Sequence, residues 1–233
     1  MITRIDWHSH ILPKLDDGSS SIEESLAMLQ RLYAGGVKRV ALTPHFYPDT
    51  DDPETFLASR EKSYELLRGS LGEHIPLLML GAEVAYFDGI RVCDQMKGLV
   101  IEGTNCLLIE LPMSHWTNRM FANILTLRDR IDLVPLLAHI DRYHLGHREW
   151  DMVSHYIDNG GLVQANAEMF LSPWKRQKAI RMLENGMIHV IGSDCHNMTK
   201  RPPLIGNAFD YIETRGDQLA IEKLNKTMNG ILN

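Results

Sequence analysis

Two histidines stand one residue apart near the start of the chain, in the stretch DWHSHILPKLDDG at residues 6–18. In an extended strand, residues i and i+2 point to the same side, so His8 and His10 can direct two imidazoles at one point. This is the geometry of a pair of metal ligands, and an aspartate pair with a glycine follows it closely. Two half-exposed polar residues would give the same pattern, so the interpretation depends on the rest of the chain.

Residue types that bind metals recur at the ends of later apolar runs. The full set of candidate ligands is His8, His10, Asp17, His45, Glu83, Glu110, His139, Asp194 and His196. Each has an ordinary alternative: His139 could be a hydrogen-bonded core histidine, and Glu83 could be an acid at the start of a helix. Their placement at the same end of successive runs predicts one shared metal site.

The number of candidate ligands indicates more than one ion. Five histidines and four carboxylates exceed what one ion of four to six ligands can use, so we expect two or three ions, with a glutamate free to bridge them. Nitrogen and oxygen ligands without sulfur suit zinc, manganese or iron, and the sequence does not choose among these three.

The elements that must position these residues alternate between apolar runs and amphipathic stretches. The seven expected strands are 3–8, 39–45, 77–83, 106–112, 133–139, 162–168 and 188–194. The expected helices are 21–36, 54–71, 116–129, 149–159, 174–186 and a region beyond 206. In the first of them Ser21 can cap the helix with Glu24 reaching back, and a glycine pair ends it.

This alternation predicts an α/β fold with parallel strands that helices cover on both faces. A closed barrel and an open doubly wound sheet both fit the alternation. Only in a barrel do the carboxyl ends of all strands meet at one rim, so the positions of the candidate ligands favour the barrel. The length of 233 residues fits a single domain spanning residues 1–233.

Two arginines follow the same strand ends. Arg142 lies three residues after His139, and Arg201 lies five residues after His196. Guanidinium groups match the oxygens of a phosphate two at a time and can stabilise the charge of a transferring phosphoryl group. Each could instead be a surface arginine in a loop, but a metal site beside them disfavours this alternative.

Composition excludes several classes of partner. The net charge of −6 disfavours nucleic acid, although it leaves a small anionic substrate open. The amino-terminal residues contain no apolar segment of a signal peptide, and the longest apolar runs are too short to span a bilayer. Three widely spaced cysteines, Cys93, Cys106 and Cys195, indicate reduced thiols rather than a disulfide framework. We therefore expect a cytoplasmic protein without membrane insertion.

The motifs together resemble those of the PHP (polymerase and histidinol phosphatase) superfamily over nearly the whole chain. In order they are DWHSH, DDG, TPH, GAE, IEL, AHIDR and SDCHN with the RPP that follows it. The resemblance is strongest to the bacterial, metal-dependent protein tyrosine phosphatases associated with capsule and exopolysaccharide synthesis. It implies a distorted seven-stranded TIM-like (β/α) barrel that holds three metal ions.

The resemblance also implies roles for individual residues. The implied ligand sets are His8, His10, Glu83 and Asp194 for one ion, Glu83, Glu110 and His139 for the second, and Asp17, His45 and His196 for the third. Arg142 and Arg201 match the phosphate-binding arginines. The implied reaction is hydrolysis of phosphotyrosine by hydroxide that the metals activate, and the implied partner is a bacterial tyrosine kinase. A water molecule, His45 or Asp17 could protonate the leaving group, and no ligand position is substituted.

Three other functions stay open at this point. The nearest is a small-molecule phosphomonoesterase of the same superfamily, with a substrate such as histidinol phosphate. A metal-dependent nuclease is disfavoured by the net charge and by the lack of a basic stripe. A barrel that binds a kinase tail without hydrolysing it is disfavoured by the complete ligand set. The oligomeric state and the regulation of the protein do not follow from the sequence.

Cys195 and Arg201 have the C-x5-R spacing of thiol-dependent tyrosine phosphatases, an unrelated solution to the same reaction. The intervening HNMTK has no glycine to let the loop curl around phosphate, and strand alternation turns Cys195 away from its neighbours Asp194 and His196. We therefore expect Cys195→Ser to keep most phosphatase activity and iodoacetamide to have little effect. A chelator should abolish turnover until manganese or zinc is restored. A serine variant that is inactive yet still holds its metals would contradict the metal mechanism.

Overall fold

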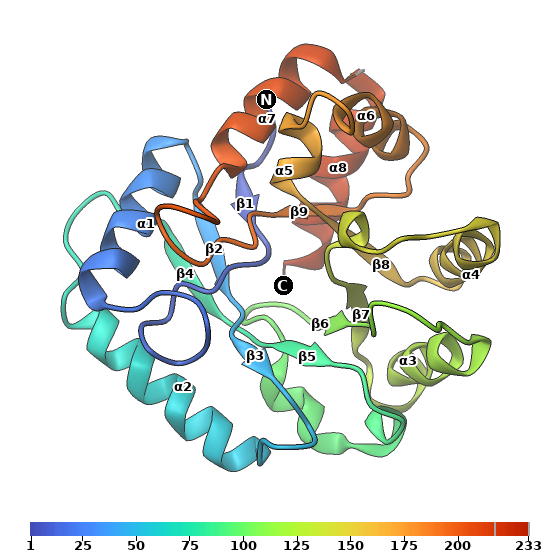
Figure 1. The fold of residues 1–233 in the computed structure, drawn as a ribbon, viewed down its shortest axis with the longest axis horizontal. Helices are drawn as coiled ribbons and strands as arrows, with labels where there is room; N and C mark the ends of the chain where they lie inside the picture. The colour runs from blue at the N-terminus through green and yellow to red at the C-terminus, as the bar shows by residue number, and fades with distance from the viewer. Residues whose placement is uncertain (217, 233) are drawn as a thin grey trace.

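The computed structural model describes residues 1–216 and 218–232, and in this part of the chain short parallel strands form a curled sheet (Figure 1). The strands are β1 (Ile5–Asp6), β2 (Arg39–Leu42), β3 (His45–Phe46), β4 (Leu77–Leu80), β5 (Glu83–Ala85), β6 (Cys106–Glu110), β7 (Val134–Leu137), β8 (Leu162–Asn166) and β9 (Val190–Gly192). Hydrogen bonding gives the orders β1-β2-β4 and β3-β5-β6-β7-β8-β9, with every pair parallel.

Backbone hydrogen bonds join the first and last strands and close the barrel. The Trp7 amide donates to the Ile191 carbonyl at 3.2 Å, and the Asp194 amide donates to the His8 carbonyl at 2.8 Å. The segment after β1 also contacts the chain after β2, because the Thr43 amide donates to the Ser9 carbonyl at 2.9 Å. The predicted distorted (β/α) barrel of seven segments is therefore confirmed.

Two of the seven predicted strands are each interrupted once. The predicted strand 39–45 divides into β2 and β3 around Thr43 and Pro44, and 77–83 divides into β4 and β5 around Gly81 and Ala82. Pro44 has no amide hydrogen to donate to a ladder, and a glycine weakens a strand interior. The prediction also extended strand 162–168 too far, since Ala167 already begins helix α5.

Helices lie outside the strands (Figure 1). They are α1 (Ile22–Ala34), α2 (Pro53–Arg68), α3 (Asn118–Ile131), α4 (His147–Asp158), α5 (Ala167–Leu171), α6 (Arg176–Glu184), α7 (Ile205–Arg215) and α8 (Gln218–Ile231), with 3₁₀ turns η1 (Ile90–Val92), η2 (Asp94–Leu99) and η3 (Ile140–Arg142). Ser21 caps α1 by accepting from the Glu24 amide, as predicted. The Glu24 carboxylate instead reaches back to the Ser20 amide at 3.0 Å.

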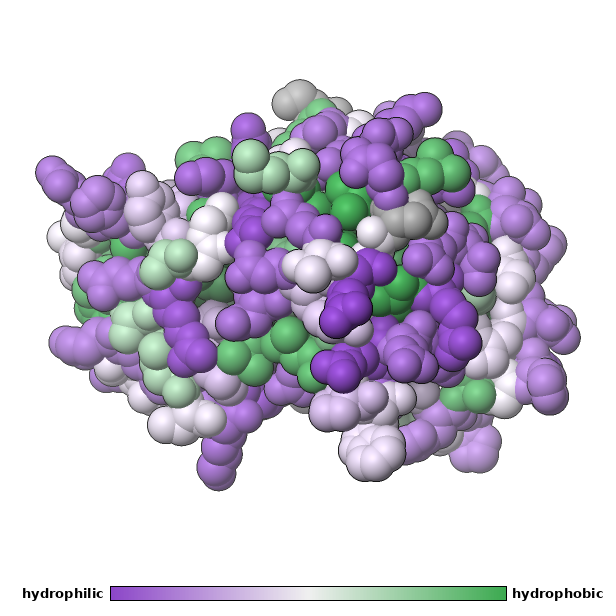
Figure 2. Space-filling model, turned by 90° about the horizontal axis from the view of Figure 1, so that it is seen from above, coloured by the Kyte–Doolittle hydropathy of each residue, from purple (hydrophilic) through white to green (hydrophobic). Residues whose placement is uncertain are grey.

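Apolar side chains from the strands and the inner helix faces form one buried cluster. Polar side chains cover most of the face seen in Figure 2, with apolar ones showing between them. Among the described helices, none has the length and apolar character needed to cross a membrane. Because the strands are parallel, all their carboxyl ends lie at one end of the barrel, and this end holds the candidate ligands.

Candidate metal centre

All nine candidate ligands gather at the carboxyl-terminal rim of the barrel. They are His8 and His10 after β1, Asp17 before α1, His45 in β3, Glu83 in β5, Glu110 at the end of β6, His139 after β7, and Asp194 and His196 after β9. Three groups have ligand atoms within 4.8 Å of one another: His10, Asp17, His45 and His196; His8, His10 and Asp194; and His45, Glu83 and Glu110.

The Glu83 carboxylate lies at the centre of this arrangement. Its Oε2 lies 3.3 Å from Nε2 of His8 and of His10, and 3.0 Å from Nδ1 of His45. Its Oε1 lies 2.8 Å from Nε2 of His139. Four imidazoles, two from the segment after β1, one from β3 and one from the loop after β7, thus surround one buried carboxylate, which is the position of a bridging ligand.

Two buried carboxylate oxygens test whether metal ions fit this site. Glu83 Oε2 and Asp194 Oδ1 are fully enclosed and have no hydrogen-bond partner in the described part of the chain. A buried oxygen without a partner loses its hydration without compensation, so such atoms are rare unless a ligand satisfies them. The Nε2 atoms of His8 and His10 lie only 3.0 Å apart beside them. These nitrogen and oxygen donors fit transition-metal ions.

The group that contains Asp17 lies at the mouth of the site rather than in its interior. Asp17 Oδ1 lies 3.4 Å from Nε2 of His45 and 3.3 Å from Nε2 of His196. The Asp17 side chain is 68% exposed, whereas that of Glu83 is 1% exposed. The cluster therefore runs from a closed interior to a solvent-open edge that a substrate can reach.

The electrostatics of the cluster favour cations. Burial by itself raises the pKa of Glu83, but the facing imidazoles, His8 foremost, hold this pKa well below its usual range. Burial lowers the pKa of His10, and Asp16 and Glu83 outweigh this effect and raise it to about 10. The carboxylates thus create a negative potential in the buried part of the site, which favours positive charge there.

Both predicted phosphate-binding arginines point at the same carboxylate. Arg142 Nη1 lies 3.3 Å from Asp194 Oδ2, and Arg201 Nη2 lies 2.5 Å from the same oxygen. Arg201 Nη1 also donates to Nε2 of His196 at 2.8 Å. The side chains of Arg142 and Arg201 are 38% and 33% exposed, so each guanidinium has one side on the cluster and one side toward solvent.

Asp16 belongs to the site although the sequence analysis assigned a role only to its neighbour Asp17. Asp16 Oδ2 lies 2.7 Å from Nδ1 of His10, which orients the ring and leaves Nε2 directed into the cluster. A Cβ on Gly18 would lie 2.2 Å from the His10 carbonyl oxygen, so only glycine lets this loop fold over the histidine. The adjacent aspartates and glycine were the sequence feature that could have revealed this role.

Two amides of β8 were also missed, because this strand contributes no ionisable ligand. Gln164 Oε1 accepts from the His139 backbone amide at 2.6 Å and lies 3.2 Å from Nδ1 of His8. Asn166 Nδ2 donates to Asp194 Oδ2 at 2.9 Å. The amides therefore hold three candidate ligands from outside the cluster. Two amides inside the apolar run LVQANAE were the available indication.

Backbone strain marks two of the candidate ligands. His139 has φ 30° and Asp194 has φ 52°, both in the left-handed region that side chains with a Cβ rarely adopt. Such residues cost about 1 kcal/mol or more and persist where the surroundings hold them. The Gln164 side chain accepts from the His139 amide, and the His8 carbonyl accepts from the Asp194 amide. These hydrogen bonds restrain the two residues at the ends of β7 and β9.

Cys195 belongs to none of the three ligand groups found among the described residues. Its side chain is fully buried, and its backbone forms a parallel bridge with Ser9. Burial raises the pKa of the thiol well above its usual value, and the charge of Asp6 adds to this effect. A reactive thiolate needs a lowered pKa and access to substrate, so the geometry opposes the thiol mechanism.

The grouping overlaps with the ligand sets implied by the resemblance but is not identical to them. His10 also reaches the group at the mouth, and His45 also reaches Glu83 and Glu110. His139 Nε2 lies 3.2 Å from Glu110 Oε1, in keeping with an implied shared ion. Which residue holds which ion stays a prediction.

The fold and site define a class of protein: a parallel α/β barrel whose carboxyl-terminal rim gathers imidazoles and carboxylates suited to several metal ions, with two arginines beside them. The family is shown by the sequence. Residues 4–231 match the model of the CpsB/CapC family of capsular polysaccharide synthesis, and this chain belongs to that family.

Individual relatives agree with this assignment. The chain is 30% identical to the tyrosine-protein phosphatase CpsB of Streptococcus pneumoniae over 223 residues, which covers 89% of each chain. It is 27% identical to the tyrosine-protein phosphatase YwqE of Bacillus subtilis, over 84% of this chain and 79% of that protein. A solved structure from work on YwqE and CpsB, described there as unique metal-dependent tyrosine phosphatases, matches the fold with a TM-score of 0.79 at 24% identity, over 96% and 92% of the two chains.

The pair His8→Ala and His10→Ala tests the interior of the cluster. We expect the double variant to lose most of its bound metal and most of its activity, because two converging nitrogen ligands disappear. Metal analysis of protein purified without chelator measures the first effect, and circular dichroism should stay nearly native. Unchanged metal content would show that these histidines are not ligands.

Proposed function

We propose that this protein is a metal-dependent tyrosine phosphatase that hydrolyses phosphotyrosine on a protein of a capsule or exopolysaccharide system. The observation that carries the proposal is the cluster of nine candidate ligands, in which His139 joins the others through Glu83 and Glu110, with two half-exposed arginines directed at one of its carboxylates. The names of the similar proteins CpsB and YwqE support the same activity.

We propose that the nine ligands hold two or three ions of manganese, iron or zinc in the groups described above. Bound ions would neutralise the phosphate dianion and supply hydroxide near neutral pH. The chain itself orients the ligands: Asp16 sets the His10 ring, and Gln164 contacts the His8 ring. Each contact fixes Nδ1 of its histidine and leaves Nε2 for the cluster.

Arg142 and Arg201 would bind the phosphoryl oxygens on the solvent-facing side of Asp194. Their forked donors can hold two oxygens each and stabilise the charge that spreads over the transferring group. This role requires Arg201 to exchange part of its contact with His196 and Asp194 for the substrate.

A cleft beside the cluster is suited to the body of the substrate. It has a volume of about 710 Å³, and its lining includes Leu15, Asp17, His45, Tyr47 and Phe56. The exposed Tyr47 ring stacks on the His45 imidazole, with centroids 5.2 Å apart and planes inclined by 22°. Arg201 contacts His196, and Asp17 Oδ1 lies within 3.4 Å of Nε2 of both His196 and His45. Because His45 and Asp17 line the cleft, a phosphoryl group at the arginines would place an aromatic ring beside it.

Residues at the mouth of the site would transfer a proton to the leaving group. Asp17 is exposed, and its Oδ1 contacts Nε2 of both His45 and His196, so Asp17 and His45 are the candidates for holding that proton. A tyrosine phenolate leaves readily because its pKa is about 10, so a strong general acid is less necessary than for an alkyl phosphate.

The wider setting follows as part of the proposal. The phosphotyrosine would belong to a bacterial tyrosine kinase of the same system, and the protein would act in the cytoplasm as one domain spanning residues 1–233. The three free cysteines, Cys93, Cys106 and Cys195, fit a reducing compartment.

A small-molecule phosphatase is the second candidate, and one observation favours it. The cleft lining also carries the carboxylates of Asp16, Asp51 and Asp52, which would attract an amine such as that of histidinol phosphate. The same carboxylates would attract basic residues beside a phosphotyrosine, so the lining alone does not separate the two substrates.

Competition between substrates tests the proposed function. We expect the manganese-loaded protein to hydrolyse a phosphotyrosine peptide with kcat/KM at least tenfold above that for histidinol phosphate or for the matched phosphoserine peptide. Phosphate release measures all three rates, and a chelator should abolish each. A higher kcat/KM for histidinol phosphate would replace the proposed substrate, and activity that survives the chelator would remove the metal mechanism.

Lysine in place of either arginine separates phosphate binding from structure. Arg142→Lys and Arg201→Lys keep the charge but lose the fork, so kcat/KM should fall by about tenfold or more while bound metal stays near the wild-type amount. Arg119→Lys, at an exposed ion pair with Asp88, is the matched control and should leave both quantities unchanged. Metal loss in proportion to activity would assign the arginines to structure instead.

A further inference from the structure

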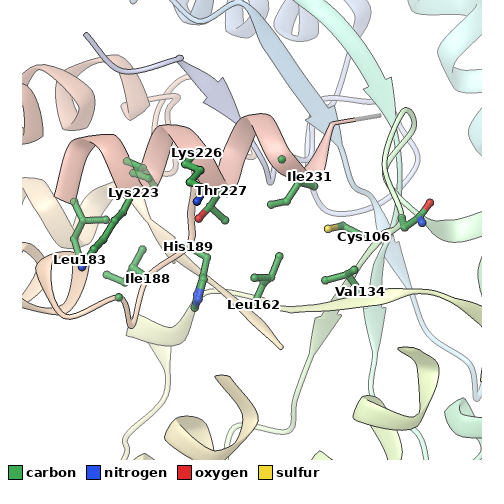
Figure 3. A pocket seen from close by; sticks show the side chains of 14 residues that line it. Cys106, Val134, Leu162, Leu183, Ile188, His189, Lys223, Lys226, Thr227 and Ile231 are labelled. Carbon is green, nitrogen blue, oxygen red and sulfur yellow. The ribbon is translucent and has the colours of Figure 1, made fainter. Parts of the chain in front are cut away.

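A second cavity lies at the amino-terminal ends of the strands, opposite the end that holds the metal centre. Figure 3 shows this cavity from close by. Its volume is about 600 Å³. The strand residues that line it are the first ones of β6, β7 and β8, namely Cys106, Val134 and Leu162. Since ligands gather at the other ends of these strands, the cavity is separate from the proposed active site. One side of α8 closes it (Figure 3).

The interior of the cavity is apolar. Its apolar lining consists of Val134, Leu162, Leu183, Ile188, Leu224 and Ile231. Cys106 adds a neutral surface, because burial raises the pKa of its thiol to about 12. A cavity of this volume and lining is in the range of sites that enclose small organic molecules.

The polar residues of the lining include a histidine and no carboxylate. His189 Nδ1 accepts from the Val163 amide at 3.2 Å. Burial lowers the pKa of His189 to about 4, so the neutral ring carries its proton on Nε2. In the part of the chain that the structure describes, this Nε2 has no hydrogen-bond partner within the protein.

Two lysines of α8 add positive charge at the same cavity. Neither Lys223 nor Lys226 forms an ion pair with any described residue, although the whole chain has a net charge of −6. Both are exposed, so they stand at the opening rather than in the apolar interior. Figure 3 shows their side chains reaching from the helix beside the apolar residues. An anion at the opening would be favoured and a cation repelled.

We propose that this cavity binds a small organic anion with an apolar body, of the chemical class of the medium-chain carboxylates. The hydrocarbon part would lie against Leu162 and Leu224, and the carboxylate would meet Lys223 and Lys226 at the opening. The inference is independent of the proposed phosphatase activity, because its residues and its test lie outside the metal centre.

Titration calorimetry of the full chain with decanoate, below its micelle concentration, tests the proposal. We expect one site per chain for decanoate and no binding of decyltrimethylammonium, which has the same tail and the opposite charge. Equal binding of the two would show only a nonspecific apolar surface and would overturn the inference.

Two variants locate the binding site. Gly230 lines the cavity and is exposed, and a Cβ there meets no atom within 4 Å, so Gly230→Leu adds a side chain at the opening and should weaken decanoate binding by about fivefold or more. The double variant Lys223→Gln and Lys226→Gln should weaken binding by about fivefold or more. Lys97→Gln, in η2 and outside the cavity, is the matched control and should bind like the wild type.

Two results of the binding measurements on these variants would contradict the proposal. Unchanged decanoate affinity in a folded Gly230→Leu variant would overturn it. If circular dichroism shows that this variant does not fold, the double lysine variant decides, and wild-type affinity there would overturn the proposal equally.

Discussion

The structure depends on one constraint: a buried carboxylate, Glu83, must be surrounded by groups that stabilise its charge. Isolation of a carboxylate from water costs several kcal/mol, roughly, even after the protein relaxes. Four imidazoles meet this requirement, and they can do so only because parallel strands bring their carboxyl ends to one rim. Closure between β1 and β9 then places His8 beside Asp194. The fold that brings the strand ends to one rim is therefore also what assembles the cluster.

The same cluster explains why metal ions are needed for the proposed reaction. Four candidate carboxylates face only two arginines, so a phosphate dianion would meet repulsion at the rim without further positive charge. Glu83 Oε2 and Asp194 Oδ1 have no hydrogen-bond donor among the described residues, and bound cations would compensate for this loss. Arg201, which already contacts Asp194 and His196, shows where positive charge is favoured.

The outer contacts keep this charged site in one arrangement. Asp16 holds His10, Gln164 holds the backbone of His139, and Asn166 holds Asp194. The left-handed backbone at His139 and Asp194 persists because these neighbours restrain it. Such contacts cost nothing at the moment of reaction, since the ligands are already oriented before substrate arrives.

The sequence by itself determined the α/β alternation, the barrel and the set of candidate ligands, because strand periodicity and residue type are local properties. It placed His8 after the first strand and Glu110 late in the fourth, whereas His45, expected to end the strand 39–45, instead begins β3. The interruptions at Pro44 and Gly81 arise from a proline without an amide hydrogen and a glycine inside a strand, but they were not predicted because each run was taken as one continuous strand. Only the tertiary structure decided that Asp16, Gln164 and Asn166 orient the ligands, and that a cavity opens beneath α8. These features join segments that are distant along the chain, and no local pattern records which distant groups will meet when the barrel closes.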